Sequence, residues 1–152
     1  AASYSTIPEF LRQTCKKHRK RIAILNKSGY RTKPYSYAQL YDQILRTASV
    51  LDDLKIRKGD RILILGHNGI EWISIFLAAA SQGIISVPLD LNSDHTLIRK
   101  IITRTKPKAI FTSKKIPFKN IQFSDLLAET ANAKPKAPAA VRPGDIAQIL
   151  YT

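Results

Sequence analysis

The sequence GDRILILGHNGIEWISIFLAAASQGIISVPLD, residues 59–90, determines the fold class. It contains two short apolar runs, Ile62–Leu65 and Ile84–Leu89, which lack the alternation of a strand with one solvated face. Each run is therefore predicted to be a strand buried on both faces. The apolar segment between them, Ile70–Ser81, is long enough to be a helix that lets the two strands run parallel. The stretch is predicted to be a βαβ unit at the core of an α/β domain.

The connecting helix is apolar on nearly every turn, so we expect it to be buried on more than one side. Asn68 is the expected N-cap, because an asparagine side chain can accept a hydrogen bond from the first free N–H groups of a helix. Gly83 is the expected residue past the helix end, where left-handed backbone favours glycine.

Residues upstream of this unit predict two helices and a hairpin. Thr6–Glu9 and Ser36–Gln39 both have the capping-box pattern that starts a helix. Between them, Arg21–Leu25 and Tyr30–Tyr35 are β-prone runs that flank the turn residues Asn26–Gly29, which predicts a β-hairpin. The second helix is expected to carry one apolar stripe: Leu40, Ile44, Ala48, Leu51 and Leu54.

Downstream, the alternation of strand and helix continues. Ser93 or Asp94 can cap a helix that Pro107 ends, and Ala109–Phe111 is then a strand. Ile121–Phe123 is expected to be one more short strand. The order β-α-β-α-β predicts an α/β fold with a doubly wound, mostly parallel sheet and a short N-terminal β-hairpin.

Three segments are expected along the chain. Residues 1–130 are predicted to form one α/β subdomain. Residues 131–144 contain three prolines among alanines and lysines and are predicted to be a linker. Residues 145–152 are predicted to begin another strand.

The chain is strongly basic, with 25 Lys and Arg against 11 Asp and Glu and a net charge of +14. Arg12–Lys33 holds nine basic residues and no acidic one, and the segment between Asp94 and Asp125 holds eight more. Such charge attracts nucleic acid, anionic lipid or phosphorylated ligands without selecting among them. A solvated face, or a face that meets an acidic partner domain, is the favoured explanation. No nucleic-acid motif accompanies the charge, so nucleic acid is the less favoured partner.

Composition also indicates a cellular compartment. Cys15 is the only cysteine, which excludes an intrachain disulfide and suits a reducing compartment. No apolar run approaches the ~20 residues of a membrane span, and no signal-peptide pattern is visible. We expect a cytoplasmic protein, with peripheral contact to an anionic membrane as an alternative. The chain contains no methionine, so we expect it to be an excerpt of a longer chain or a processed product.

Candidate chemistry is sparse. The loop Gly66–Gly69 follows the first strand, where open parallel sheets place their ligands. It matches neither the dinucleotide-binding fingerprint nor the Walker loop, and a tight turn explains both glycines. The three histidines, His18, His67 and His95, do not have metal-ligand spacings. From these residues we predict no catalytic set and no metal site.

Several motifs nevertheless resemble one protein family in their order and spacing. They are Tyr35–Leu40, Ala48–Leu51, Lys58–Ile62, Asn68, Ala78–Gly83 and Val87–Asp90. Together they resemble the N-terminal region of AMP-forming acyl-CoA synthetases and related adenylate-forming ligases, over nearly the whole chain. Asp145–Thr152 is similar to the strand that precedes the signature phosphate loop of that family.

The resemblance implies an enzyme that activates a carboxylic acid, with a fatty acid as the favoured substrate. ATP and the acid would form an acyl-adenylate and pyrophosphate with the help of Mg²⁺, and CoA would then accept the acyl group. Thr152, and next to it Tyr151, are implied as edge residues of the nucleotide-binding loop. The chain is expected to be inactive alone and to have the remainder of the ligase chain as its partner. Apolar surface left exposed by missing neighbours would favour an artificial dimer.

Three other functions stay open. Within the family, an amino-acid or aryl-acid adenylation domain is the nearest alternative. Outside it, the charge would suit a basic binding module for nucleic acid or anionic membrane. A small Rossmann-like nucleotide binder is the weakest alternative, because the glycine fingerprint and its acidic ribose partner are missing.

Overall fold

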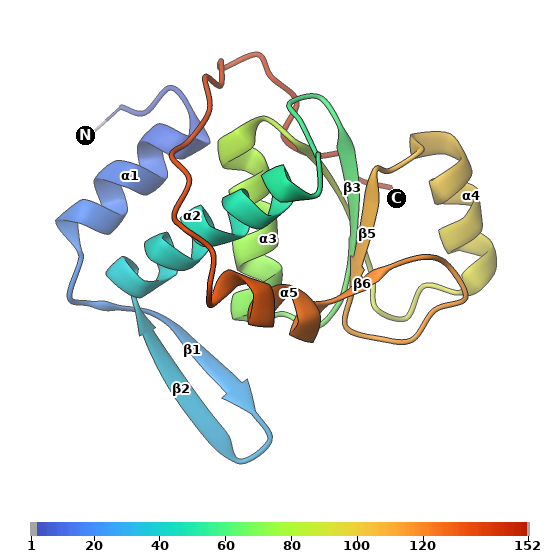
Figure 1. Ribbon diagram of the computed structural model, residues 1–152, viewed down its shortest axis with the longest axis horizontal. Coiled ribbons are helices and arrows are strands. Elements are labelled where there is room, and N and C mark those ends of the chain that lie inside the picture. The colour runs from blue at the N-terminus through green and yellow to red at the C-terminus, as the bar shows by residue number, and fades with distance from the viewer. Residues whose placement is uncertain (1–2, 152) are drawn as a thin grey trace.

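The computed structural model describes residues 3–151 and has an α/β fold (Figure 1). Among these residues, no helix is both long and apolar enough to cross a membrane. The elements follow in the order α1 (Ile7–Lys17), β1 (Ile22–Ser28), β2 (Arg31–Ser36), α2 (Tyr37–Asp53), β3 (Arg61–Leu65), α3 (Ile70–Gln82), β4 (Ile85–Leu89), α4 (His95–Thr105), β5 (Ala109–Thr112), β6 (Ile121–Gln122) and α5 (Phe123–Thr130).

The main sheet has four parallel strands in the order β4-β3-β5-β6. Strand β3 lies in the interior, and its Leu63 is in register with Val87 of β4 and Ile110 of β5. The chain thus adds one strand on one side of β3 and later strands on the other side. This order confirms the predicted doubly wound parallel sheet.

Helices cover both faces of the sheet and create two apolar cores. Ile62 and Ile64 of β3 belong to the core that contains residues of α2, α3 and α5. Leu63 and Leu65 point to the opposite face and join the core that contains residues of α4. Because successive side chains of a strand face opposite sides, a strand between two cores must be apolar throughout. That requirement explains the unbroken apolar run in the sequence.

Helix α3 is buried as predicted, but its N-cap differs from the prediction. Gly83 follows the helix in the left-handed conformation with φ 70°, as expected. The N-cap is Gly69 and not Asn68, so the cap residue has no side chain that could accept a hydrogen bond from the helix. Instead the N–H of Ile70 donates to Oδ1 of Asn26, 3.1 Å away in β1. A side chain from a distant strand therefore does the work expected of Asn68.

The N-terminal hairpin is also confirmed, with its turn displaced. Strands β1 and β2 pair antiparallel and extend away from the rest of the molecule (Figure 1). Asn26 pairs with Lys33 and Ser28 pairs with Arg31, so the turn lies at Gly29 and Tyr30. The predicted turn residue Asn26 is a strand residue that pairs with Lys33, and its side chain is held at the start of α3.

Three predicted helix starts are present. Thr6 accepts a hydrogen bond from the N–H of Glu9, and Asp94 accepts one from the N–H of Leu97. At α2 the capping box is complete: Ser36 accepts from the N–H of Gln39, whose side chain accepts from the N–H of Ser36.

Residues 131–144, called the strap below, contain no helix or strand and lie against α2 and α3. The N–H of Lys136 donates to the carbonyl of Leu45 at 2.9 Å, and the N–H of Ala139 donates to that of Ser81 at 3.0 Å. Gln82 donates from Nε2 to the carbonyl of Ala137 at 2.9 Å. The backbone of the strap is thus fixed to two helices.

After the strap, the chain pairs with the outer edge of β4 at one parallel bridge, Ser86 with Gln148. The N–H of Ser86 donates to the carbonyl of Ala147, and the N–H of Ile149 donates to that of Ser86. The next bond of a parallel ladder would need an N–H from Pro88, which proline does not have. The strand expected over residues 145–152 is therefore present, within the described residues, as a single bridge.

Candidate functional site

The carboxyl ends of the parallel strands form the edge where open α/β sheets bind ligands. Strands β3, β4 and β5 end there at Leu65, Leu89 and Thr112. A hollow of about 270 Å³ opens at this edge. Its walls are the loops after β3 and β4 and the first turn of α3: Gly66, His67, Asn68, Trp72, Leu89, Asp90, Leu91 and Asn92.

Gly66 is required by packing at this edge. A Cβ atom at Gly66 would lie 2.3 Å from Cε2 of Phe123 and 3.0 Å from Oγ of Ser113. The next N–H, of His67, donates to the same Ser113 Oγ at 3.0 Å. The ring of Phe123 thus fills the space beside Gly66, between the ends of β3 and β5. That position is the point at which the strand order reverses. Among the described residues, the Phe123 side chain occupies it, and no phosphate-binding loop is formed there.

Gly69 has a similar explanation. A Cβ atom there would lie 2.9 Å from Oδ1 of Asn26, the atom that accepts the first N–H of α3. Both glycines of the loop are therefore explained by close neighbours without any ligand. This agrees with the prediction of a tight turn.

The polar side chains at the hollow do not form a recognisable catalytic set. His67 and Asn68 are exposed, and the carboxylate of Asp90 accepts the N–H of Asn92 at 2.7 Å to form a local turn. Among residues 3–151, no three His, Cys, Asp or Glu side chains converge as metal ligands would. The described residues therefore do not fit a Mg²⁺ site.

Tyr151 is the one predicted nucleotide-site residue that the structure describes, and its exposed fraction is 37%. Its neighbour Thr152 lies outside the described residues. Because the bridge at Gln148 is parallel to β4, the chain from Ile149 onward runs toward the end of the sheet at which β4 finishes. Tyr151 therefore heads toward the same edge as the hollow.

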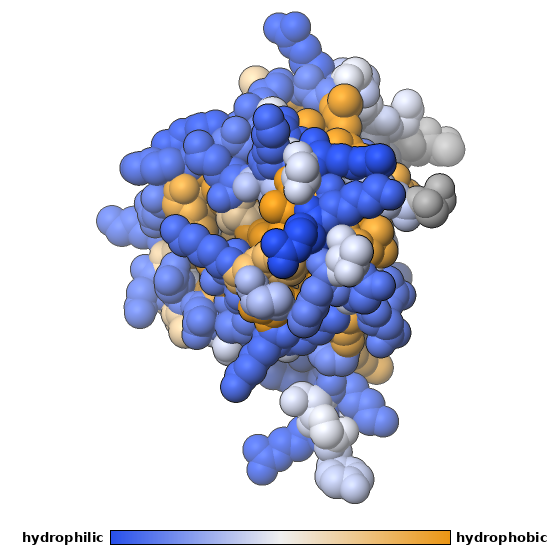
Figure 2. All heavy atoms as spheres, turned by 90° about the vertical axis from the view of Figure 1, so that its right-hand side faces the viewer, coloured by the Kyte–Doolittle hydropathy of each residue, from blue (hydrophilic) through white to orange (hydrophobic). Residues whose placement is uncertain are grey.

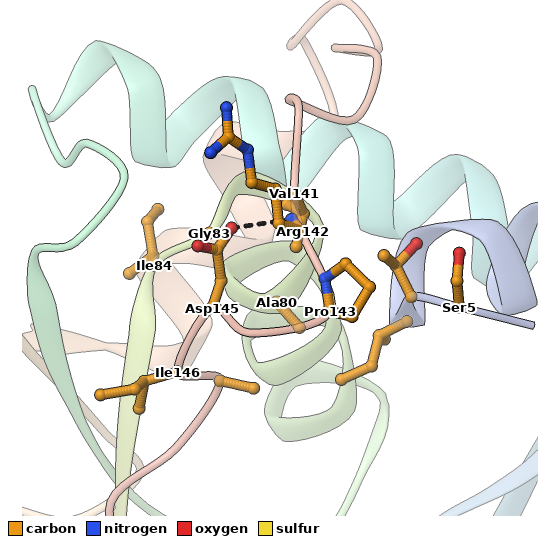
Figure 3. A pocket seen from close by; sticks show the side chains of 12 residues that line it. Ser5, Ala80, Gly83, Ile84, Val141, Arg142, Pro143, Asp145 and Ile146 are labelled. Carbon is orange, nitrogen blue, oxygen red and sulfur yellow. Dashed lines mark hydrogen bonds between the residues drawn. The ribbon is translucent and has the colours of Figure 1, made fainter.

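A second pocket, of about 220 Å³, lies at the opposite end of β4 (Figure 3). It is enclosed by the start of α1, the end of α3 with the residues after it, and the end of the strap with the segment that follows it: Ser5, Thr6, Ile7, Ala80, Gly83, Ile84, Val141, Arg142, Pro143, Asp145, Ile146 and Ala147. Since it sits at the amino end of β4, it is not the ligand crevice of the sheet.

One wall of this pocket is an electrostatic clamp that the sequence did not predict. Asp145 accepts the N–H of Arg142 at 2.8 Å, and Lys58 pairs with the same carboxylate at 2.6 Å. These two partners, the Arg142 N–H foremost, hold the pKa of Asp145 below its usual value. The clamp fixes the chain two residues before Ala147, the first residue bonded to β4. No local pattern could have revealed it, because Lys58 and Asp145 are 87 positions apart.

Comparison with known proteins shows one family over most of the chain. A family profile described as AMP-binding enzyme matches residues 11–152. A mitochondrial medium-chain acyl-CoA ligase of Mus musculus is 32% identical over 108 residues, which are 70% of this chain and 17% of the ligase. A carboxylic acid reductase of Mycobacterium marinum is 33% identical over 79 residues, 51% of this chain and 7% of the reductase.

The fold of this chain also matches that of solved protein structures. A fatty acyl CoA synthetase of Mycobacterium tuberculosis superimposes with a TM-score of 0.87 at 24% identity, covering 97% of this chain and 32% of that protein. At this identity the likeness concerns the fold alone. The chain spans only 7% and 17% of the lengths of the reductase and the mouse ligase.

Proposed function

The chain belongs to the AMP-binding enzyme family, and on that basis we propose that it is the N-terminal scaffold of an ATP-dependent carboxylic acid–CoA ligase. The observation that carries the proposal is the match over residues 11–152, together with the likeness to a medium-chain acyl-CoA ligase over 70% of the chain. The name of the reductase specifies a carboxylic acid, and the name of the ligase specifies an acyl-CoA, whose acyl group is that of a carboxylic acid.

The proposed reaction has two steps. A carboxylate oxygen of the acid attacks the α-phosphorus of ATP, and pyrophosphate leaves with the electrons of the broken P–O bond. The sulfur of CoA, having lost its proton, then attacks the acyl carbon, and AMP leaves. Both steps transfer a group without oxidation or reduction, so they need no further reactant.

In this proposal the described residues supply the frame and not the reacting groups. The sheet, the Phe123 packing at its switch point and the ion pair of Asp145 with Lys58 hold the chain that runs to Tyr151. In the proposal, Tyr151 and its sequence neighbour Thr152 are the edge residues of the loop that holds pyrophosphate. The loop's remaining donors, the acyl pocket and the CoA site belong to the partner of this chain, the remainder of the ligase. The lone cysteine supports a reducing compartment, so we place the activity in the cytoplasm.

Pyrophosphate release with ATP and Mg²⁺ tests the proposal. The assay compares residues 1–152 with the complete product of the same gene, in the presence of medium-chain and long-chain fatty acids, aryl acids or amino acids. We expect the complete product to release pyrophosphate with fatty acids, on the order of 1–10 per second. We expect the 152-residue chain to release none.

Each outcome bears on a different part of the proposal. Release by the 152-residue chain alone would overturn its role as a scaffold. Release only with amino acids or aryl acids would replace the fatty-acid substrate by the alternative within the family. A complete product that releases no pyrophosphate with any acid would overturn the ligase function.

A further inference from the structure

The outer side of α4 and the loops beside it form a surface of unneutralised positive charge. We call it the α4 basic face, and it consists of seven exposed side chains: Arg99, Lys100, Arg104, Lys106, Lys108, Lys115 and Lys119. None of them pairs with a described carboxylate, since the salt bridges among residues 3–151 use Arg46, Arg57, Lys58 and Lys136. Figure 2 looks onto this side of the molecule, where hydrophilic side chains surround a smaller group of hydrophobic ones.

The face is held in one arrangement by contacts between α4 and the loop after β5. Lys114 donates from Nζ to the carbonyls of Leu91 and Ser93, which ties that loop to the segment before α4. The guanidinium of Arg99 lies 5.3 Å from the centre of the Phe118 ring, and His95 approaches the same ring edge-on. The cations of the face therefore project from a structured surface.

One large apolar side chain is exposed on α4 among these cations. Leu97 is 41% exposed although it is a large aliphatic residue, and it shares a helix stripe with Lys100 and Arg104. Phe118 and Ile116 are half-buried and pack on the core under α4, and Phe118 lies on the flank of the helix that carries His95 and Arg99. The face thus combines cations with one exposed aliphatic side chain.

We propose that the α4 basic face docks on the surface of an anionic lipid bilayer. Helices that lie in a membrane interface insert apolar side chains between headgroups and place Lys and Arg beside anionic lipids. Leu97 fits the first role, and the seven cations fit the second. This inference rests on the charges and exposure of α4 and does not depend on the proposed ligase activity.

The same face is poorly equipped for nucleic acid. The Phe118 ring is covered on one side by Arg99, so it offers less of the free aromatic surface that unpaired bases stack on. The amide of Asn120 is also engaged: it donates to the carbonyl of Phe118 and accepts from Gln122, each at 2.7 Å. It is therefore not free to read the edge of a base.

Vesicle sedimentation tests the inference on the 152-residue chain. The vesicles are phosphatidylcholine alone, or phosphatidylcholine with about one third phosphatidylglycerol, which supplies the anionic surface. We expect binding to the anionic vesicles only, weakening as salt is raised. Arg99→Gln, Lys100→Gln and Arg104→Gln combined should lower the partition coefficient on the order of 100-fold, at about fivefold for each basic residue.

Two further variants separate the face from net charge. Lys16→Gln, Lys17→Gln and Arg31→Gln combined also reduce the net charge from +14 to +11, on α1 and β2, and should change binding less than about threefold. Leu97→Ala should weaken binding about fivefold while leaving the salt dependence unchanged. Circular dichroism and thermal melting confirm that each variant is folded.

The inference fails if the α4 variant binds like the unchanged chain, or if the control variant loses as much binding as the α4 variant. It also fails if a DNA duplex at ~0.15 M salt displaces the protein from anionic vesicles and loses affinity with the α4 variant, because the face would then belong to nucleic acid.

Discussion

Gly66 illustrates how one residue in a conspicuous loop can be required by packing alone. Two glycines after a buried strand resemble a phosphate-binding turn in sequence. The structure instead sets the Phe123 ring where a side chain at Gly66 would be. The glycine therefore permits the first residue of α5 to pack against the end of β3.

We predict that Gly66→Ala destabilises the fold by about 1–3 kcal/mol, because the added methyl group overpacks this contact. Urea unfolding measures the change. Gly144→Ala is the matched control, since a Cβ atom there meets nothing within 4 Å, and its effect should stay within about 0.5 kcal/mol.

A double-mutant cycle with Phe123→Leu identifies the cause. The smaller side chain relieves the overlap, so the two substitutions together should cost less than the sum of their separate effects. Strictly additive effects would show that Phe123 is not what excludes a side chain at position 66.

At the scale of the secondary-structure elements, the start of α3 depends on another element. Its first N–H is bonded by Asn26 of the hairpin, and the hairpin is thereby attached to the helix. Asn68 is of a residue type that is favoured as an N-cap, but it is exposed and lies outside the helix.

Asn26→Ala is therefore expected to cost about 1 kcal/mol of stability, the usual effect of removing a helix cap. Asn68→Ala should change stability by less than about 0.5 kcal/mol. Chemical unfolding of the two variants side by side distinguishes them, and equal losses would contradict the assignment of the cap to Asn26.

The same comparison shows which parts of the fold were predictable. Helix starts at Thr6, Ser36 and Asp94 follow from a side chain that bonds an N–H three residues later, so their signal is local. The buried strands follow from unbroken apolar runs. The cap from Asn26 could not be predicted, because it acts across 44 positions of sequence.

The candidate site was predictable only in its location. The carboxyl edge of the sheet follows from the strand order, whereas its filling by Phe123 depends on a residue 57 positions after Gly66. The single bridge at Gln148 does have a cause that is visible in the sequence, because Pro88 limits pairing along that edge of β4. This cause can be recognised only when the strand order, with β4 outside β3, is known.

At the scale of the whole molecule, ion pairs in the strap and directly after it join parts of the chain that are far apart. Asp52 pairs with Lys136 and Arg57, and Asp145 pairs with Lys58. The pKa of Asp52 is lowered, first by its hydrogen bond with Lys136, and the pKa of Asp145 is lowered, first by the N–H of Arg142.

These lowered values predict a loss of stability in acid. A carboxyl group whose pKa is lower in the folded state stabilises the fold above its usual value of 3.8, and the stabilisation disappears as pH falls through the lowered value. Urea midpoints between about pH 6 and about pH 2 should therefore drop less for Asp52→Asn with Asp145→Asn than for the unchanged chain.

Asp53→Asn is the control, because Asp53 is exposed and belongs to no salt bridge among the described residues. It should leave the acid-dependent drop as it is. An identical drop in the double variant would show that the ion pairs of Asp52 and Asp145 do not contribute to the loss of stability in acid.

The interior position of β3 has a consequence for how the chain is made. Ile62 is in register with Ala109, 47 residues later, so the centre of the sheet lacks one neighbour until β5 has been synthesised. Pairing between strands this far apart in sequence forms slowly, since the segment between them must first lose conformational entropy. During translation, α3, β4 and α4 all leave the ribosome before this pairing is possible. The apolar β3 has to wait, which makes it the segment that a chaperone would need to shield.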